Sequence, residues 1–533
     1  MRTLGQIYPP LLLLMILFVQ IVSLFVNYSI YDSRELVILC CWIPLFTLPY
    51  LITKKKFIYR IAVTALFMGG FINLCHLLIL KGPITASSLF VLLNTNISEA
   101  KEFMELKSSF LMLLIIPYIF LFIVAIKNIK PVKIYPKSKY IIAAILTFSV
   151  IFLSESLIHG NLVRKGTPQT TKALISFAAE IKSYSALKKR KVVSIEAKLK
   201  SSELEQHVFV LIIGESCNRN HMSLYNYSKK TNPKLEKRDD IIVYSNVVSP
   251  FSNTIGSVLS ALTESNLENK MGFDKSISLI DIFYSLDFKT IWLSNQSPIG
   301  IWDNATFNLA QTSDISVFAN NHGNTSFEST YLSSYDERLF QPFYSALNAS
   351  TKNKFIVIHL MGSHSSYSKR YPAEYNIFTD YSTKKEKIIN EYDNSVLYND
   401  FIVDSLLNIL DSYCLKRSKP ICSCIYLSDH GENVYDENDN VGHDYSGSIP
   451  KSNVEIPFIV WLSSGYKKYY SNKEQTILSN KDLPFISDDL FHSIIDLNDI
   501  DYKAYAKTRS VFNQEFNSER PRILEDNMDY DLK

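Results

Sequence analysis

Five apolar runs dominate the first third of the chain. They cover residues 11–27, 35–53, 57–80, 109–126 and 140–158. Each run is close to the ~20 residues that a helix needs to cross a bilayer. Lysines gather at 54–56 and between residues 127 and 139, whereas the intervening stretches 28–34 and 81–108 are less basic and carry acids. Because basic loops stay in the cytoplasm, the pattern predicts a five-span α-helical transmembrane domain in residues 1–160. The N-terminus would lie inside, and the chain after residue 160 outside the cytoplasmic membrane. A cleaved signal peptide would account for the first run alone.

The hydrophobic pattern changes twice after the last apolar run. Residues 161–204 are polar and basic, which is typical either of an amphipathic connector on the outer membrane surface or of a solvated linker. Between residues 205 and 500, short apolar runs alternate with helical patterns. This alternation predicts an α/β domain whose central, mostly parallel sheet carries helices on both faces. Residues 501–533 are polar and acidic at the end, and we expect a peripheral tail there. The expected strands are Val208–Ile213, Thr290–Leu293, Phe355–His359, Ile421–Leu427 and Pro457–Leu462, and the expected helices include Leu279–Leu286 and Lys384–Leu410.

Charge and cysteine content narrow the functional class. The formal net charge is only +3 over 533 residues, which argues against a protein that binds nucleic acid by neutralising phosphates. Three of the seven cysteines fall inside the apolar runs. Outside them, an oxidising compartment would allow Cys414 to pair with Cys422 or with Cys424, and the spacing does not choose between them. We expect a monomer.

Two of the expected strands end in an acidic residue. Val208–Ile213 is followed by Gly214 and Glu215, and Ile421–Leu427 is followed by Ser428, Asp429 and His430. Carboxylate and imidazole groups suit zinc, and the carboxyl ends of strands in an open α/β sheet form the crevice where active sites lie. Glu215 alone would be read as an acid at a helix start. Two such strand ends together favour a shared metal site.

Three further features complete the candidate chemistry. His364 follows a strand and a glycine turn, and His443 lies in a polar loop beyond Asp429; both suit metal ligands or phosphate contacts. His359 lies inside an apolar run and is expected to be a core histidine with satisfied hydrogen bonds. The stretch 249–262 runs from hydroxyl-rich residues into an apolar helix, which places hydroxyls at a helix N-terminus that favours phosphate. An ordinary N-cap explains the same pattern.

The order of these residues resembles a known family, the phosphoethanolamine transferases of the bacterial envelope, within the alkaline phosphatase/sulfatase superfamily. The resemblance covers nearly the whole chain and is closest to the branch that acts on the lipopolysaccharide core. The segments that are similar to family signatures are Gly214-Glu215-Ser216, Met222-Ser223-Leu224-Tyr225, Thr231-Asn232-Pro233, Met361-Gly362-Ser363-His364, Arg370-Tyr371-Pro372, Tyr392-Asp393-Asn394 and Leu427-Ser428-Asp429-His430-Gly431-Glu432. The resemblance implies an alkaline-phosphatase/sulfatase-like fold for residues 205–500.

The resemblance also implies residue roles. Thr254 would be the nucleophile and a zinc ligand. The remaining ligands of one tightly bound Zn²⁺ would be Glu215, Asp429 and His430. His364 and His443 would bind the transferred phosphate or a second zinc. Thr95 and Glu99 would contact the donor lipid. Relative to the lipid A enzymes, the chain lacks a disulfide around the nucleophile, where Pro250 and Ser260 stand, and has Val91 and Gly300 in place of a donor-site asparagine and a pocket lysine.

The implied reaction moves phosphoethanolamine from phosphatidylethanolamine to a lipopolysaccharide acceptor, a core sugar or lipid A. It would pass through a phosphoethanolamine-threonine intermediate and release diacylglycerol, in the periplasm at the bacterial inner membrane. Two alternatives remain open among transferases: a phosphoglycerol transferase of the lipoteichoic-acid-synthase type and a periplasmic glucan phosphoethanolamine transferase. A metal-binding envelope scaffold is the non-enzymatic alternative. A sulfatase is disfavoured because Ser252–Gly256 lacks the proline and arginine that formylglycine formation needs.

Overall fold

The computed structural model divides into two compact units, one within residues 8–178 and one within residues 195–532. Each unit is described by itself. The structure describes residues 8–26, 40–45, 55–80, 84, 89, 110–127, 140, 144–151, 170, 171, 173–175, 177, 178, 195–200, 206–273, 275–296, 305–319, 334–417, 420–443 and 448–532.

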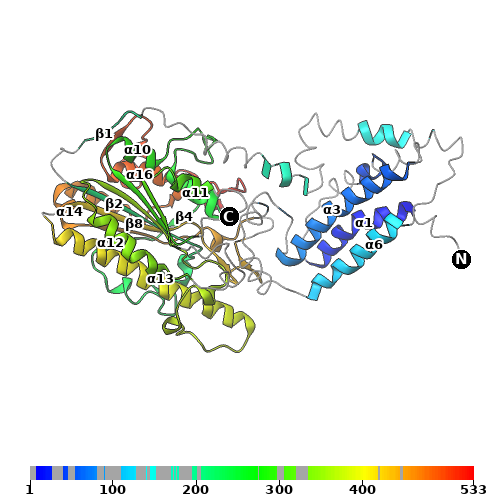
Figure 1. Ribbon diagram of the computed structural model, residues 1–533, viewed down its shortest axis with the longest axis horizontal. Helices are drawn as coiled ribbons and strands as arrows, with labels where there is room; N and C mark the ends of the chain where they lie inside the picture. The colour runs from blue at the N-terminus through cyan, green and yellow to red at the C-terminus, as the bar shows by residue number, and fades with distance from the viewer. Residues whose placement is uncertain are drawn as a thin grey trace. The chain divides into compact units, whose positions relative to one another are not determined.

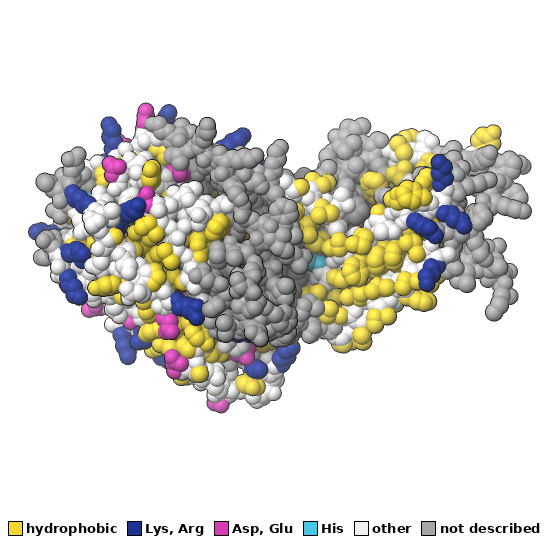
Figure 2. All heavy atoms as spheres, in the orientation of Figure 1, with side chains coloured by type: hydrophobic (Ala, Val, Ile, Leu, Met, Phe, Trp, Pro, Cys, Tyr) yellow, Lys and Arg dark blue, Asp and Glu magenta, His cyan; other side chains and the backbone are white. Residues whose placement is uncertain are grey.

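The first unit contains three apolar helices, α1 (Tyr8–Phe25), α3 (Lys56–Leu80) and α6 (Ile115–Lys127), the last preceded by a 3₁₀ turn. Tyr118 is buried between them, with its ring 5.5 Å from that of Phe18 and 5.3 Å from that of Phe67. Many other apolar side chains point outward, and Figure 2 shows how much of this unit's visible surface is hydrophobic. Proteins in water rarely expose so large an apolar surface, whereas contact with lipid would cover these side chains.

Two segments of this unit are long and apolar enough to cross a membrane, Lys56–Ile79 and Phe110–Lys127, and Leu11–Phe25 is a shorter apolar helix. They coincide with the first, third and fourth predicted spans. The predicted spans 35–53 and 140–158 lie largely outside the described residues, so the count of five stays a prediction.

The second unit is built around a seven-stranded sheet with the order β3-β11-β8-β2-β7-β5-β6 (Figure 1). Strands β8, β2, β7, β5 and β6 are parallel neighbours, while β11 runs antiparallel to both β8 and β3. The sheet is therefore mixed, with a parallel centre as the alternating pattern predicts. The strand bounds are β2 His207–Gly214, β3 Ile241–Tyr244, β5 Lys289–Ser294, β6 Ile315–Phe318, β7 Lys354–His359, β8 Ile421–Ser428 and β11 Phe458–Leu462.

Helices cover both faces of this sheet, and the central strand β2 shows why. Phe209, Leu211 and Ile213 belong to one hydrophobic core, whereas the alternate residues Val208 and Val210 belong to another. The first core includes side chains from α9, α10 and α16, and the second includes side chains from α12 and α13 (Figure 1). A strand buried on both faces reads as a continuous apolar run, as β2 does. The helix bounds are α9 Thr254–Leu262, α10 Leu279–Ser285, α12 Phe340–Asn348, α13 Lys384–Leu415 and α16 Leu490–Leu497.

The polar C-terminal segment is packed into this unit, so the expectation of a peripheral tail is wrong. Val511 and Phe512 belong to the first core, and Leu524 is fully buried. Strand β13 (Ile500–Tyr502) pairs with β1 (Ala197–Leu199). A few apolar side chains anchor a segment whose average composition is polar, and composition does not reveal them.

One disulfide lies beside the sheet. Cys414 at the end of α13 is bonded to Cys422 in β8, and Cys424 is a free, buried thiol. Of the two pairings that the sequence leaves open, the structure has the one between Cys414 and Cys422.

Candidate metal and nucleophile site

Two acids emerge side by side at the carboxyl end of the sheet. Strands β2 and β8 are parallel neighbours, and Gly214 lies opposite Ser428, so the next residues, Glu215 and Asp429, leave the sheet together. Both side chains are buried. Ser216 then adopts a left-handed conformation with φ of 55°, and its N–H donates to Asp429 Oδ1 over 3.1 Å. Such backbone strain is concentrated at functional sites in proteins.

His430 turns one ring nitrogen toward these acids. Its Nδ1 lies 2.8 Å from the Gly431 carbonyl oxygen and donates to it, so the neutral tautomer that keeps this hydrogen bond has its unprotonated nitrogen at Nε2. Nε2 lies 3.3 Å from Glu215 Oε1 and 3.5 Å from Asp429 Oδ2. This tautomer is the one that a histidine needs in order to bind a metal through Nε2.

Thr254 is the first residue of α9 and meets the same group. Asn253 caps the helix, because its Oδ1 accepts from the Gly256 N–H over 3.0 Å. Thr254 Oγ1 lies 3.2 Å from both carboxylate oxygens of Glu215 and 3.5 Å from His430 Nε2. The structure thus brings together Thr254, Glu215, Asp429 and His430, the four residues predicted for one zinc site.

The charges of this group are unbalanced. Burial raises the pKa of Asp429 above its usual value, and the neighbouring charge of Glu215 adds to the rise. Burial opposes ionisation of Glu215 as well, but the hydrogen bond and charge of His430 bring the pKa of Glu215 below its usual value. Burial lowers the pKa of His430, yet the two acids outweigh it and raise that pKa to about 10. Without a metal, two buried carboxylates thus share a single imidazolium, and a bound metal cation would take the place of the Nε2 proton and offset their negative charge.

The donor atoms fit a zinc ion. Ligand atoms of Glu215, Asp429 and His430 all lie within 4.8 Å of one another. Asp429 Oδ2 is buried and has no hydrogen-bond partner among the residues that the structure describes. A buried carboxylate oxygen without a partner lowers the stability of the folded state unless a ligand such as a cation binds it. Two carboxylates and one imidazole, with a hydroxyl beside them, form a ligand set typical of zinc.

A second group adjoins the first. His443 Nδ1 lies 3.0 Å from Glu432 Oε2, and Tyr367 donates its hydroxyl hydrogen to Glu432 Oε1 over 2.5 Å. The rings of His443 and His430 are 4.5 Å apart, and ligand atoms of His430, Glu432 and His443 lie within 4.8 Å of one another. The sequence singles out His443 but misses Glu432 as a candidate ligand. Because Nδ1 of His430 donates to Gly431, only Nε2 can bind a metal, and His430 cannot be a ligand of a separate ion in each group.

The turn after β7 supports Glu215 from the other side. Ser363 N–H donates to the Glu215 carbonyl over 2.9 Å. Gly362 has φ of +53°, and a Cβ built on it would lie 2.8 Å from Glu215 N and O. His364 follows on this turn, and its charge contributes to lowering the pKa of Glu215. His364 therefore lies close to Glu215, and its role in binding phosphate or a second zinc stays a prediction.

Asp336 holds this turn in place. One of its carboxylate oxygens accepts from the Met361 N–H over 2.8 Å, and the other accepts from the Gly362 N–H over 2.9 Å. Gln296 adds a contact to the site itself, with Nε2 3.4 Å from Glu215 Oε2. Sequence patterns single out neither Asp336 nor this contact of Gln296.

Two other predictions have different outcomes. His359 is buried as expected, but its Nε2 has no hydrogen-bond partner in the described part of the chain. The expectation of a satisfied core histidine is therefore wrong for that atom. Thr95 and Glu99, the predicted donor-lipid contacts, lie outside the described residues.

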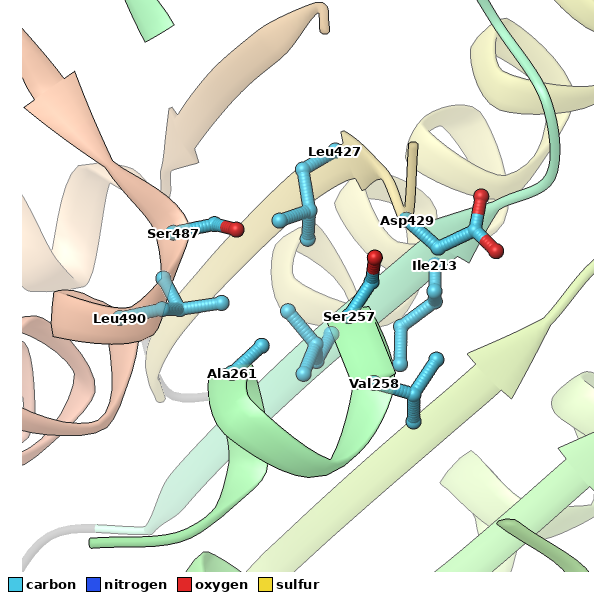
Figure 3. A pocket seen from close by; sticks show the side chains of 9 residues that line it. Ile213, Ser257, Val258, Ala261, Leu427, Asp429, Ser487 and Leu490 are labelled. Atoms are coloured by element: carbon cyan, nitrogen blue, oxygen red, sulfur yellow. The ribbon is translucent and has the colours of Figure 1, made fainter. Parts of the chain in front are cut away.

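A small cavity lies under helix α9. Ser257 and Val258 of α9 face Ile213 and Leu427 across it, and Asp429 lies at its edge (Figure 3). The lining is mostly apolar, so the cavity does not suit a phosphate group.

Comparison with known proteins agrees with this geometry. Residues 207–500, more than half of the chain, match the family described as Sulfatase. Phosphoethanolamine transferase EptC of Escherichia coli (strain K12) is 28% identical over 505 residues, which cover 89% of this chain and 85% of that protein. The crystal structure of the C-terminal periplasmic domain of E. coli EptC in complex with Zn superposes with a TM-score of 0.57 at 28% identity, covering 63% of this chain and 96% of that domain.

A whole-chain likeness is found as well. The integral membrane protein lipooligosaccharide phosphoethanolamine transferase A (EptA) of Neisseria meningitidis has a TM-score of 0.69 at 18% identity, covering 93% of this chain and 97% of that one. At that identity the likeness concerns the fold, which combines a membrane part with a sulfatase-like part.

Fold and site thus define a sulfatase-like enzyme with a metal-binding centre attached to an apolar helical unit. The chain belongs to the Sulfatase family and, within it, to the phosphoethanolamine transferases.

Proposed function

We propose that this enzyme transfers phosphoethanolamine from phosphatidylethanolamine to a lipopolysaccharide acceptor, with Thr254 as the nucleophile. One observation carries the proposal: Thr254 Oγ1 lies within 3.2 Å of Glu215 in a buried group of metal-ligating atoms. The relatives named above are phosphoethanolamine transferases, and the Neisseria meningitidis protein is named a lipooligosaccharide phosphoethanolamine transferase, which supports an acceptor of this class. A core sugar or lipid A is the acceptor that we propose.

In the first step of the proposed reaction, the residues of the site have separate roles. A zinc ion held by Glu215, Asp429 and His430 would lower the pKa of a neighbouring hydroxyl and offset phosphate charge. Thr254 sits at the N-terminus of α9, whose backbone N–H groups favour a bound phosphate. The hydroxyl loses its proton, and its oxygen forms a bond to phosphorus as the bond to diacylglycerol breaks. Diacylglycerol takes up a proton on leaving.

The second step restores the enzyme. An acceptor oxygen forms a bond to the same phosphorus, the bond to Thr254 breaks, and the acceptor's proton returns to the threonine. His364 and His443 would contact the phosphoryl oxygens or hold a second zinc; positive charge and hydrogen bonds at those oxygens lower the barrier most.

The apolar helices suit a lipid donor. A chain anchored by such helices meets phosphatidylethanolamine in the bilayer, and Thr95 and Glu99 are the proposed donor contacts. We place the five predicted spans in the bacterial inner membrane and the sulfatase-like unit in the periplasm. The proposed domain bounds are 1–160, 161–204 and 205–500, with residues 501–533 as the C-terminal segment.

Intact-mass analysis of the full-length protein tests the proposal. After incubation with phosphatidylethanolamine vesicles and no acceptor, the wild type should gain the mass of one phosphoethanolamine group, and Thr254→Ala should gain none. Thr508→Ala, which removes an exposed hydroxyl, serves as the control and should behave as the wild type.

Two results would contradict the proposal. A Thr254→Ala protein that still modifies lipopolysaccharide would rule out the nucleophile. A wild-type protein that takes phosphoglycerol from phosphatidylglycerol, but nothing from phosphatidylethanolamine, would instead support the lipoteichoic-acid-synthase type. Mass spectrometry of lipopolysaccharide and glucan fragments from cells with and without the enzyme would identify the acceptor.

A further inference from the structure

The C-terminal segment brings a carboxylate to the loop that precedes Thr254. Glu525 Oε1 accepts from the Ser252 N–H over 3.0 Å and from the Ser252 hydroxyl over 2.7 Å. Glu525 Oε2 accepts from Asn253 Nδ2 over 3.3 Å. The Glu525 N–H also donates to the Pro250 carbonyl over 2.9 Å. One residue of the C-terminal segment thus makes four hydrogen bonds to the loop 250–253.

The contact with Asn253 joins this loop to the nucleophile. The Asn253 side chain has two ends: Oδ1 accepts from the Gly256 N–H and caps α9, while Nδ2 donates to Glu525. Both ends are therefore fixed, and the next residue along the chain is Thr254. A shift of Asn253 would move the first turn of α9 and with it the Thr254 hydroxyl.

The segment has other anchors that do not use the Glu525 side chain. Arg522 forms an ion pair with Asp531 and donates to the Asn246 carbonyl, and Leu524 is buried. Asp526 accepts from the Ile449 N–H over 3.1 Å. The segment can therefore stay in place when the Glu525 carboxylate is removed.

We propose that Glu525 is a positioning residue for the transfer reaction. Its carboxylate holds Ser252 and Asn253 by charge-assisted hydrogen bonds and so fixes Thr254 Oγ1 against Glu215. Glu525 does not contact the reacting atoms; it acts through the loop. This inference rests on the proposed role of Thr254 as the nucleophile.

The expected effect concerns turnover rather than binding. Displacing a reacting group by about 1 Å can cost roughly 10²-fold in rate, whereas the donor is held by other residues and Glu215, Asp429 and His430 remain as zinc ligands. Loss of the carboxylate should therefore lower kcat and leave KM and zinc content unchanged.

The experiment compares full-length Glu525→Ala and Glu525→Gln with the wild type. Glu519→Gln, a change of an exposed glutamate in the same segment, is the matched control. Initial rates of transfer from phosphatidylethanolamine vesicles give kcat and KM, elemental analysis gives zinc per chain, and thermal unfolding gives the Tm. We expect Glu525→Ala to lower kcat about 10- to 100-fold at wild-type KM, zinc content and Tm.

Glu525→Gln should lie between Glu525→Ala and the wild type. Its side-chain oxygen can still accept from Ser252, but its NH₂ group would face the NH₂ group of Asn253, and two donors cannot bond to each other. Should Glu525→Ala fail to fold, Glu525→Gln decides the question. A lower kcat at wild-type Tm supports positioning.

Two patterns would overturn the inference. In one, both Glu525 variants turn over like the wild type while Thr254→Ala is inactive; the nucleophile then stands and the positioning role fails. In the other, kcat, zinc content and Tm fall together, so that Glu525 only stabilises the fold. Full activity of Thr254→Ala would instead show that the proposed function itself is wrong.

Discussion

Replacing Gly362 with alanine tests how closely the turn after β7 fits against Glu215. Gly362 has φ of +53°, a conformation that costs a residue with a side chain about 1–2 kcal/mol. The added Cβ would also lie 2.8 Å from Glu215 N and O. These are backbone atoms that no rotamer change can remove, and overpacking of this kind typically costs about 1–3 kcal/mol. Together the two effects predict a loss of about 2–5 kcal/mol in the free energy of unfolding.

Thermal unfolding of the full-length protein in detergent, followed by tryptophan fluorescence, measures this loss. Trp292 and Trp461 are buried in the sulfatase-like unit and report on its unfolding. Gly362→Ala should unfold at least several degrees below the wild type, and its zinc content should fall because Glu215 is displaced. Ser368→Ala, an exposed change near this turn, should do neither. Wild-type Tm and zinc content in Gly362→Ala would refute the reasoning, since the turn would then be free to move away from Glu215.

Three further predictions concern the metal, one histidine and the disulfide. Chelation should lower the Tm and added zinc should restore it, because the two buried carboxylates of the metal site would lose their cation; a Tm insensitive to chelator would contradict a bound metal. Asp393 and Asp436 outweigh the effect of burial on His221 and raise its pKa to about 9. The resulting contribution to the free energy of unfolding, up to about 3 kcal/mol, is fully present below pH 6.5 and is lost as the pH rises through 9. Denaturant unfolding at a series of pH values should show this decline for the wild type and a flatter profile for His221→Gln. Equal slopes for the two proteins would count against the prediction. Cys414→Ser opens the loop closed by the bond to Cys422, and at a sequence separation of 8 it should cost about 2–3 kcal/mol; an unchanged urea midpoint would show that the bond adds no stability.

The central strands and the acids that end them could be predicted because both signals are local. An apolar run followed by an acid marks Glu215 and Asp429 in the sequence, and a parallel sheet with the two strands as neighbours brings the acids together. Thr254 is different. Its pattern fits an ordinary helix cap equally well, and only the resemblance to a family separates it from the neighbouring hydroxyl residues.

The residues that support the site could not be predicted, because their contacts join distant parts of the chain. Asp336 binds a turn about 25 residues further along, and Glu525 binds Ser252 across 273 positions. Each lies in a segment without a periodic pattern. Burial of Val511 and Phe512 likewise depends on how the C-terminal segment meets the first core, which composition does not encode.

The long-range contacts of Glu525 also bear on when the site forms. The residues around Thr254 come from strand ends near positions 215 and 429, from a helix start at 254 and from a segment near 525. Contacts so far apart in sequence form slowly, because the intervening chain must close long loops first. During synthesis the acids can meet before residue 525 has been translated, whereas the loop before Thr254 cannot yet be held. On this account, the hydrogen bonds of Glu525 to the loop before Thr254 are among the last contacts of the site to form.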